Sequence, residues 1–187
     1  MLGSIEADDT ELVNRAQRGD QVAMNTLLSR HYDRIHSICY RLAGNDADAG
    51  DATQEALMAI VRGLARFDGR SSFSTWSYRV ASNAALDEVR RRKRRPVPVE
   101  EMLAKGDLGQ GLAQQVADRV TLDEALALLP EEFRQPVVLR DVAGLDYAEI
   151  ALTLELAPGT VRSRIARGRR RLLEIVGNQS PLDGRQS

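Results

Sequence analysis

The sequence predicts an all-α protein with two small helical domains joined by a flexible linker, the C-terminal one containing a helix-turn-helix. Apolar residues recur at the helical period through most of the 187 residues, and no segment alternates like a β-strand. Between Pro96 and Val116 the period fails in a stretch of prolines, glycines and charges, which is typical of a linker. The predicted parts are a first domain at 9–95, a linker at 96–117, a second domain at 118–177 and a disordered tail at 178–187.

The first domain is predicted to be a bundle of four helices, and the first two have clear start and stop signals. Asp9 and Thr10 can cap a short helix that Gly19 ends. Asp20 caps a longer helix, which stops at Gly44. The apolar stripe of this longer helix follows a repeat close to 3.6 residues and consists of Met24, Leu27, Leu28, His31, Ile35, Ile38 and Leu42.

The third and fourth helices flank a loop with the sequence FDGRSSFS, which is rich in turn-forming residues. The third begins among Asp46, Asp48 and Asp51, where carboxylates favour the positive end of the helix dipole. The fourth begins near Ser74 and must end before Pro96, because the residue preceding a proline avoids the helical conformation.

The second domain is predicted to contain four more helices, at 118–129, 131–142, 147–154 and 158–176. Pro136 lies inside the second of them, where its missing N–H is expected to kink the helix.

The last two helices have the spacing of a helix-turn-helix. Their inner faces consist of Ile150, Ala151 and Leu154 in the first and Val161 and Ile165 in the second. Pro158 suits the first turn of the second helix, where its missing N–H leaves no bond unmade. Glu155 occupies the turn position often held by glycine, and a positive φ is less easily accommodated there by glutamate.

This geometry turns Arg162, Ser163, Ala166 and Arg167 outward, toward the major groove, where arginine can pair with guanine edges. Residues 169–171, all arginine, are then expected to contact phosphates, which sets affinity but not sequence preference. The alternative is a solvated basic helix end, because cations near a helix C-terminus are favourable in any case.

Charge is segregated along the chain although the formal net charge is only −1. The segments 1–60, 61–95, 96–160 and 161–187 carry net charges of −5, +7, −8 and +5. The overall balance therefore says little about what either basic block binds.

Composition excludes several classes of protein. The single cysteine, Cys39, cannot form an internal disulfide, and with His36 it is expected to pack in the core rather than bind metal. No apolar run approaches the roughly 20 residues needed to span a bilayer, and no secretion signal is evident. These observations favour a cytoplasmic protein, and no cofactor is expected.

The fourth helix ends in an unbroken basic run at 90–95, preceded by Phe73, Trp76, Tyr78 and Asn83. Cations beside aromatic rings and an amide suit single-stranded or melted nucleic acid. The alternative is that Phe73 and Trp76 are core residues and the run is a solvated helix end, and for Trp76 we favour the core.

At this point the chain resembles a known family. The motifs DATQEALMAIVRGLARF, FDGRSSFSTWSYRVASNAALDEVRRRKR, LALLPEEFRQPVVLRDVAGLDYAEIA and APGTVRSRIARGRRRL occur in this order. Together they are similar to the extracytoplasmic-function group of bacterial sigma factors, and the resemblance covers nearly all of residues 11–176.

The resemblance implies three sets of site residues. Asp51, Gln54 and Glu55 would contact the coiled-coil clamp of core RNA polymerase, although helix capping also accounts for an acidic helix start. The −10 element, melted and with one base flipped, would be held by Asp68, Ser72, Phe73, Asn83, Arg90, Arg91, Lys93 and Arg94. The −35 element would be contacted by Arg162, Ser163, Ala166, Arg167, Arg169 and Arg170, with Ala166 at a position where relatives can carry a larger side chain.

The implied function is that of a dissociable sigma factor without catalysis of its own. Its partners would be core RNA polymerase, promoter DNA and an anti-sigma factor, and its linker would thread through the polymerase. Two other hypotheses stay open. One is a self-sufficient regulator whose N-terminal bundle dimerises or senses a ligand. The other is an enzyme, which has little support because no Ser/His/Asp order and no glycine-rich phosphate loop occurs.

Overall fold

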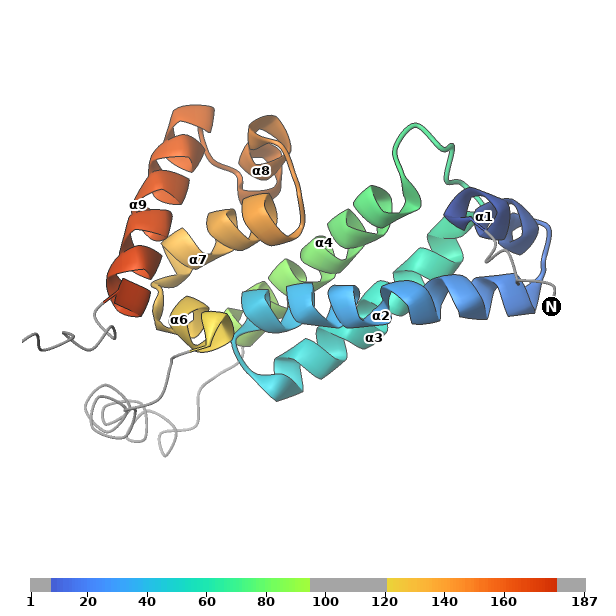
Figure 1. The fold of residues 1–187 in the computed structure, drawn as a ribbon, viewed down its shortest axis with the longest axis horizontal. Helices are drawn as coiled ribbons and strands as arrows, with labels where there is room; N and C mark the ends of the chain where they lie inside the picture. The colour runs from blue at the N-terminus through green and yellow to red at the C-terminus, as the bar shows by residue number, and fades with distance from the viewer. Residues whose placement is uncertain (1–7, 95–120, 178–187) are drawn as a thin grey trace, which may run out of the picture.

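The computed structural model describes residues 8–94 and 121–177, and within these ranges all regular structure is helical (Figure 1). The all-α prediction is therefore confirmed there, while the predicted linker at 96–117 and tail at 178–187 lie outside the described residues. The N-terminal helices are α1 (Asp9–Gln17), α2 (Gln21–Ala43), α3 (Asp46–Leu64) and α4 (Phe73–Arg94). The C-terminal elements are α6 (Leu122–Leu128), α7 (Glu131–Val137), the π-helical turn η2 (Val138–Val142), α8 (Tyr147–Leu154) and α9 (Pro158–Gly177).

The boundaries of α2 and the start of α6 follow their capping residues, whereas the predicted caps Asp9 and Thr10 lie inside α1, which has no side-chain cap. The Asp20 carboxylate accepts hydrogen bonds from the backbone N–H groups of Val22 and Ala23, at 2.9 and 3.0 Å. Gly44 ends α2 in the left-handed conformation, with φ 81°, as its position in the sequence predicted. In the C-terminal domain, α6 begins at Leu122 because Thr121 forms a capping box with Glu124.

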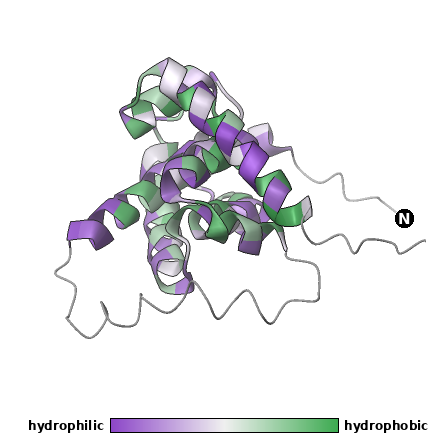
Figure 2. Cartoon of the chain, turned by 90° about the vertical axis from the view of Figure 1, so that its left-hand side faces the viewer, coloured by the Kyte–Doolittle hydropathy of each residue, from purple (hydrophilic) through white to green (hydrophobic). Residues whose placement is uncertain are grey.

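The long helices α2, α3 and α4 pack together to form the core of the N-terminal domain, and α1 lies across one end of them (Figure 1). Large aliphatic side chains of α2, such as Ile35 and Ile38, are fully buried, and so are alanines of the other two helices, such as Ala56 and Ala85. Each buried Ile contributes roughly 1.5–3 kcal/mol. The hydropathy view shows hydrophobic and hydrophilic residues alternating around each helix (Figure 2). Within the described residues, no helix is both long and apolar enough to cross a membrane.

Pro136 changes the geometry of the helix that contains it. The predicted single helix at 131–142 is instead α7 followed by the π-helical turn η2. A proline inside a helix removes one backbone donor and its ring displaces the preceding turn, so the hydrogen-bond ladder widens after it. The widened turn places the backbone carbonyl of Val142 where Arg34 of α2 donates to it at 2.8 Å.

Two helices of the C-terminal domain approach closely at Gly168 of α9. A Cβ atom there would lie 2.6 Å from Val137 Cγ2 and 3.1 Å from the backbone oxygen of Phe133. The Val137 side chain is buried and could move away only by displacing other core residues. The Phe133 oxygen belongs to the backbone and cannot move without shifting α7. Only glycine at this position therefore permits the observed contact between α7 and α9.

Replacing Gly168 with Ala should destabilise the C-terminal domain by about 1–3 kcal/mol, because the added methyl group overpacks the contact with α7. Chemical unfolding followed by circular dichroism measures this, since the single tryptophan of the chain, Trp76, reports only on the N-terminal domain. Gly159→Ala in the same helix is the matched control, because a Cβ there has no neighbour within 4 Å. Equal stability of the two variants would contradict the close-packing argument.

Candidate nucleic-acid and polymerase interfaces

The helix-turn-helix is formed by α8 and α9. A capping box starts α8, with the Asp146 carboxylate accepting from the Glu149 N–H at 2.8 Å and the Glu149 carboxylate accepting from the Asp146 N–H at 2.7 Å. The chain reverses at Glu155, whose φ of 55° is the one positive value at a non-glycine residue in 8–94 and 121–177. Ile150 and Val161 are fully buried on the inner faces of the two helices. The predicted turn therefore forms, and glutamate takes the left-handed position.

The outward face of α9 carries the residues predicted to contact the −35 element. Arg162, Ala166 and Arg167 are exposed, and Ser163 is half-buried, with its hydroxyl donating to the Thr160 carbonyl at 2.9 Å. The Arg162 guanidinium carbon lies 5.9 Å from the centre of the Tyr147 ring of α8. Arg162 and Arg167 are five residues apart, which is about 7.5 Å along the helix axis and about 140° around it, so they border the exposed face from its two sides.

The two arginines predicted to contact phosphates differ in their surroundings. The Nε and Nη2 atoms of Arg169 both donate to the Asp141 carboxylate. These hydrogen bonds raise the pKa of the Arg169 guanidinium. Arg170 is 72% exposed, and its contact with Glu174 is 4.0 Å long. Arg170 is therefore free to bind a phosphate, whereas Arg169 is already held by a carboxylate from η2.

The basic run at the end of α4 is not one uniform patch. Arg92 points inward, where it donates to the Asp48 carboxylate at 2.7 Å and to the Ala43 carbonyl at 3.1 Å, and so fixes the end of α2 to the start of α3. Arg91 pairs with Glu88 at 2.9 Å, and Lys93 pairs with Glu131 at 2.7 Å. The structural role of Arg92 could not be read from the sequence, where it is one of six consecutive cations.

The predicted −10 residues lie along α4 and in the loop before it. Asn83 is exposed on α4. In the loop, Asp68 pairs with Arg70 at 3.0 Å, and the Ser72 hydroxyl oxygen accepts from the Thr75 N–H at 3.1 Å, which caps α4. Ten residues of helix, about 15 Å, separate the start of α4 from Asn83, so the loop and Asn83 do not form a single pocket.

The aromatic residues before the basic run form a cluster around this loop. Phe73 is 4% exposed, and its ring lies 6.4 Å from Phe67 and 5.8 Å from Trp76. Trp76 is half-buried and covers Gly63 of α3, where a Cβ would be only 3.0 Å away. Trp76 therefore packs in the domain, as we favoured from the sequence, and Phe73 is also buried.

The residues predicted to contact core polymerase share the exposed face of α3. Asp51, Gln54 and Glu55 are all exposed. The same face continues into two exposed apolar residues, Met58 and Val61.

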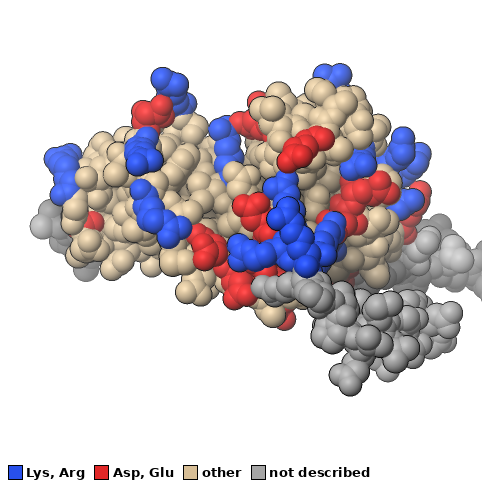
Figure 3. All heavy atoms as spheres, turned by 180° about the vertical axis from the view of Figure 1, so that it is seen from behind, with Lys and Arg blue, Asp and Glu red and all other residues tan. Residues whose placement is uncertain are grey.

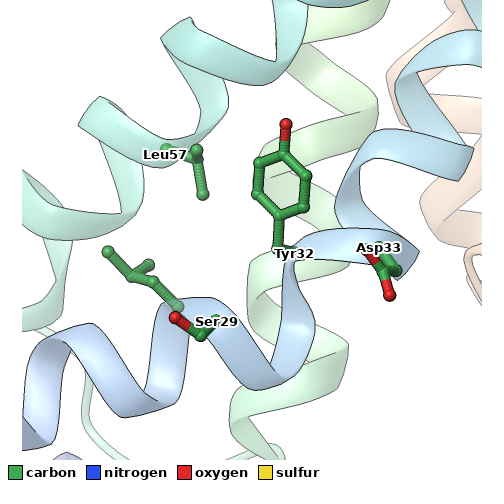
Figure 4. Close-up of a pocket in the computed structure, with 5 residues that line it drawn as sticks. Ser29, Tyr32, Asp33 and Leu57 are labelled. Atoms are coloured by element: carbon green, nitrogen blue, oxygen red, sulfur yellow. The ribbon is translucent and has the colours of Figure 1, made fainter.

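A shallow pocket of about 270 Å³ lies beside this face, between α2 and α3. Figure 4 shows Tyr32 and Leu57 pointing into the pocket from the two helices, while Asp33 points away. The candidate polymerase surface thus combines carboxylates with adjacent apolar side chains.

Ion pairs connect the two domains, and in each of them the cation belongs to the N-terminal domain. Among the described residues, Arg41 pairs with Asp123 at 2.6 Å and Lys93 with Glu131 at 2.7 Å. Arg79 also pairs with Glu149, and Arg90 with Glu155 and the Thr153 carbonyl. Figure 3 shows a dense group of basic side chains with acidic ones packed around it. Part of the basic block of the N-terminal domain is thus neutralised by the acidic block that follows it in sequence.

Two family models match this chain, Sigma-70 region 2 over residues 27–95 and Sigma-70 region 4 over residues 119–172. The chain is 35% identical to the ECF RNA polymerase sigma factor SigM of Mycobacterium tuberculosis, covering 94% of this chain and 88% of that protein. The chain belongs to the ECF group of the sigma-70 family. It is also 38% identical to the ECF RNA polymerase sigma factor SigE of Mycolicibacterium smegmatis, over 87% of this chain and 66% of that protein.

A solved structure with the same fold is the sigma factor RpoE of Bartonella quintana in complex with the anti-sigma factor NepR. It matches with a TM-score of 0.57 and 22% identity over 86% of this chain and 98% of that one. Sigma factors are dissociable initiation subunits of RNA polymerase rather than enzymes, and this chain is one of them. The region 2 match covers most of α2 and the described helices α3 and α4, and the region 4 match covers α6 to α8 and most of α9, so we call the two helical domains region 2 and region 4.

Salt should weaken the ionic contact between these two domains, because the Debye length falls from about 10 Å at 0.1 M to about 3 Å at 1 M. One cysteine is introduced into each domain and labelled with a fluorescent dye. Energy transfer between the two dyes then measures the distance between the domains, which we expect to increase with salt. Native Cys39 does not interfere, since it is buried and burial raises its pKa to about 11.

Charge reversal provides the specific test of this contact. Glu131→Lys should open the domains at low salt, and adding Lys93→Glu should close them again. Glu174→Lys is the matched control, because Glu174 is exposed and makes no cross-domain pair among the described residues. A domain separation that changes with neither salt nor Glu131→Lys would contradict an ionic contact.

Proposed function

We propose that this ECF sigma factor divides promoter recognition between the two faces described above, with region 4 reading the −35 element as duplex and region 2 holding the −10 element as melted single strand. The observation that carries the proposal is the presence of two separate basic surfaces, one on a helix-turn-helix and one on a helix beside aromatic residues and an exposed amide. A duplex-binding regulator has use for only the first of these surfaces.

In region 4, Arg162 and Arg167 would read base edges in the major groove, with Ser163 beside them and Ala166 leaving room for a base or its methyl group. Arg170 would hold a phosphate. Arg169 would join it only after exchanging its bonds to Asp141.

In region 2, Asn83 would pair with a base edge through its amide, which offers both a donor and an acceptor. Arg90, Arg91, Lys93 and Arg94 would hold the strand's phosphates. Arg90 and Lys93 are engaged with Glu155 and Glu131 of region 4, so these contacts must be exchanged when promoter DNA binds.

The exposed face of α3, with Asp51, Gln54 and Glu55, would dock onto core RNA polymerase. An acidic and amide face at this position suits a basic partner surface, and the neighbouring apolar residues would add buried area. The relative solved with an anti-sigma factor supports a partner of that class for this chain as well. The cytoplasm, where polymerase and promoters are found, is the proposed location.

Arg162→Ala and Arg167→Ala should each lower the preference for the cognate −35 sequence by about 1–3 kcal/mol, because each removes a contact to base edges. Arg170→Ala is the comparison variant. It should weaken binding to all sequences alike and reduce the slope of log affinity against log salt by about 1. Binding of the holoenzyme to cognate and altered promoters across a salt series measures both effects. If core polymerase binding fell equally, the assignment of these residues to DNA would be wrong.

Asn83→Ala should impair opening of the −10 element more than binding of the closed duplex, because a contact to a melted base forms only after opening. Permanganate reactivity of unpaired thymines measures opening, and a filter assay at low temperature measures closed binding. Asn25→Ala, an exposed asparagine on α2, is the control. Unchanged permanganate reactivity in Asn83→Ala would refute the role of this amide.

A further inference from the structure

Residues from three elements of region 4 meet at one aromatic ring. The ring belongs to Tyr147, the first residue of α8, and it is half-buried against the core of the domain. The guanidinium carbon of Arg140, in η2, lies over the ring at 5.1 Å from its centre, and that of Arg162, in α9, lies over it at 5.9 Å. Figure 1 shows α8 beside the first turns of α9. Both distances are within the range in which a cation is attracted to the face of an aromatic ring.

The position of this ring is fixed by its surroundings. Tyr147 follows directly on the N-cap residue Asp146, which exchanges hydrogen bonds with Glu149 at 2.8 and 2.7 Å, so the first turn of α8 is well defined. Arg140 is itself held, because its guanidinium donates to the backbone oxygen of Leu145 at 2.9 Å. The ring of Tyr147 is therefore a fixed surface on which another side chain can rest.

The ring is the main contact of the Arg162 side chain. Arg162 is exposed, and its guanidinium has no hydrogen bond or ion pair with any described residue. An arginine side chain has several rotatable bonds, and a ligand that binds it must order them at a cost in free energy. A contact that already restricts the side chain lowers this cost. By contrast, the Arg167 guanidinium contacts no aromatic ring within residues 8–94 and 121–177.

We infer that Tyr147 is a positioning residue, whose ring orients the Arg162 guanidinium for reading a base edge of the −35 element. The inference rests on the proposed function, since it takes Arg162 to contact a base. A guanidinium that rests its face on a ring keeps its N–H groups, which lie in its plane, available for a base edge. The attraction comes from the ring electrons, so the phenol hydroxyl is not required.

The test measures base discrimination at each position of the −35 element, with holoenzyme assembled from the full chain and core RNA polymerase. The DNA is a promoter identified by run-off transcription, together with single-base variants of it. The position at which Arg162→Ala lowers discrimination most is the position that Arg162 reads. There, Tyr147→Leu should lower discrimination about 2-fold to 5-fold, and Tyr147→Phe should keep the wild-type value. At the position found in the same way with Arg167→Ala, neither Tyr147 variant should change discrimination.

A double-mutant cycle separates positioning from a loss of stability. Tyr147→Leu removes a half-buried ring, so it also destabilises region 4. When Arg162 is already replaced by Ala, Tyr147→Leu should have no further effect on discrimination at that position, because no guanidinium is left to orient. An equal loss with and without Arg162 would overturn the inference. A loss in Tyr147→Phe as large as in Tyr147→Leu would overturn it too, since the hydroxyl would then be the group that matters.

The free full-length chain provides a second readout that does not depend on DNA. The ring current of Tyr147 should shift the NMR signals of the Arg162 side chain in the wild type and in Tyr147→Phe, and not in Tyr147→Leu. Absence of this shift in the wild type would overturn the inference.

The outcomes on DNA separate the inference from the function on which it rests. If Arg162→Ala leaves discrimination unchanged at every position, the proposed role of Arg162 fails and the inference fails with it. If Arg162→Ala lowers discrimination but Tyr147→Leu does not, only the inference fails.

Discussion

The arrangement of the two domains depends on ion pairs between them. In the absence of nucleic acid, cations of region 2 are neutralised by carboxylates of region 4: Arg41 with Asp123, Lys93 with Glu131, Arg79 with Glu149 and Arg90 with Glu155. Exposed pairs of this kind contribute only about 0–1 kcal/mol each, and salt screens them. DNA carries one charge per roughly 1.7 Å of helix axis, so it competes well with such carboxylates. These ion pairs between the domains are therefore contacts that DNA can replace one by one.

One contact between the domains differs in kind from these exposed pairs. The guanidinium of Arg134 in α7 packs on Gly44 at the end of α2, where a Cβ would lie 3.2 Å from two of its nitrogens. Burial lowers the pKa of Arg134, which is only 9% exposed. The conformation of Gly44, with φ 81°, would strain any other residue as well. Gly44 therefore ends α2 and also leaves space for the Arg134 side chain of the C-terminal domain. The local sequence predicts only the first of these two roles.

Local signals account for what the sequence predicted well. Asp20 and Gly44 act within one turn of the residues they cap, and so do Asp146 and Glu149, which makes helix ends readable from spacing. The sequence did not reveal that Gly168 permits the contact of α7 with α9, or that Asp141 holds Arg169. These contacts join residues about thirty positions apart. The sequence around one residue of such a pair does not indicate which distant residue it will contact.

The cations of the basic run of α4 point in different directions and have different partners. Successive residues are rotated by about 100°, so four adjacent cations cannot all face one ligand. Arg90 and Lys93, three residues apart, both face region 4, while Arg92 is turned inward to Asp48. Arg94 has no ion pair with any described residue, so a phosphate can reach it without displacing a described carboxylate. A strand bound there, as proposed, would lie next to Arg90 and Lys93 and would have to exchange their ion pairs, which would couple the release of region 4 to the capture of the strand.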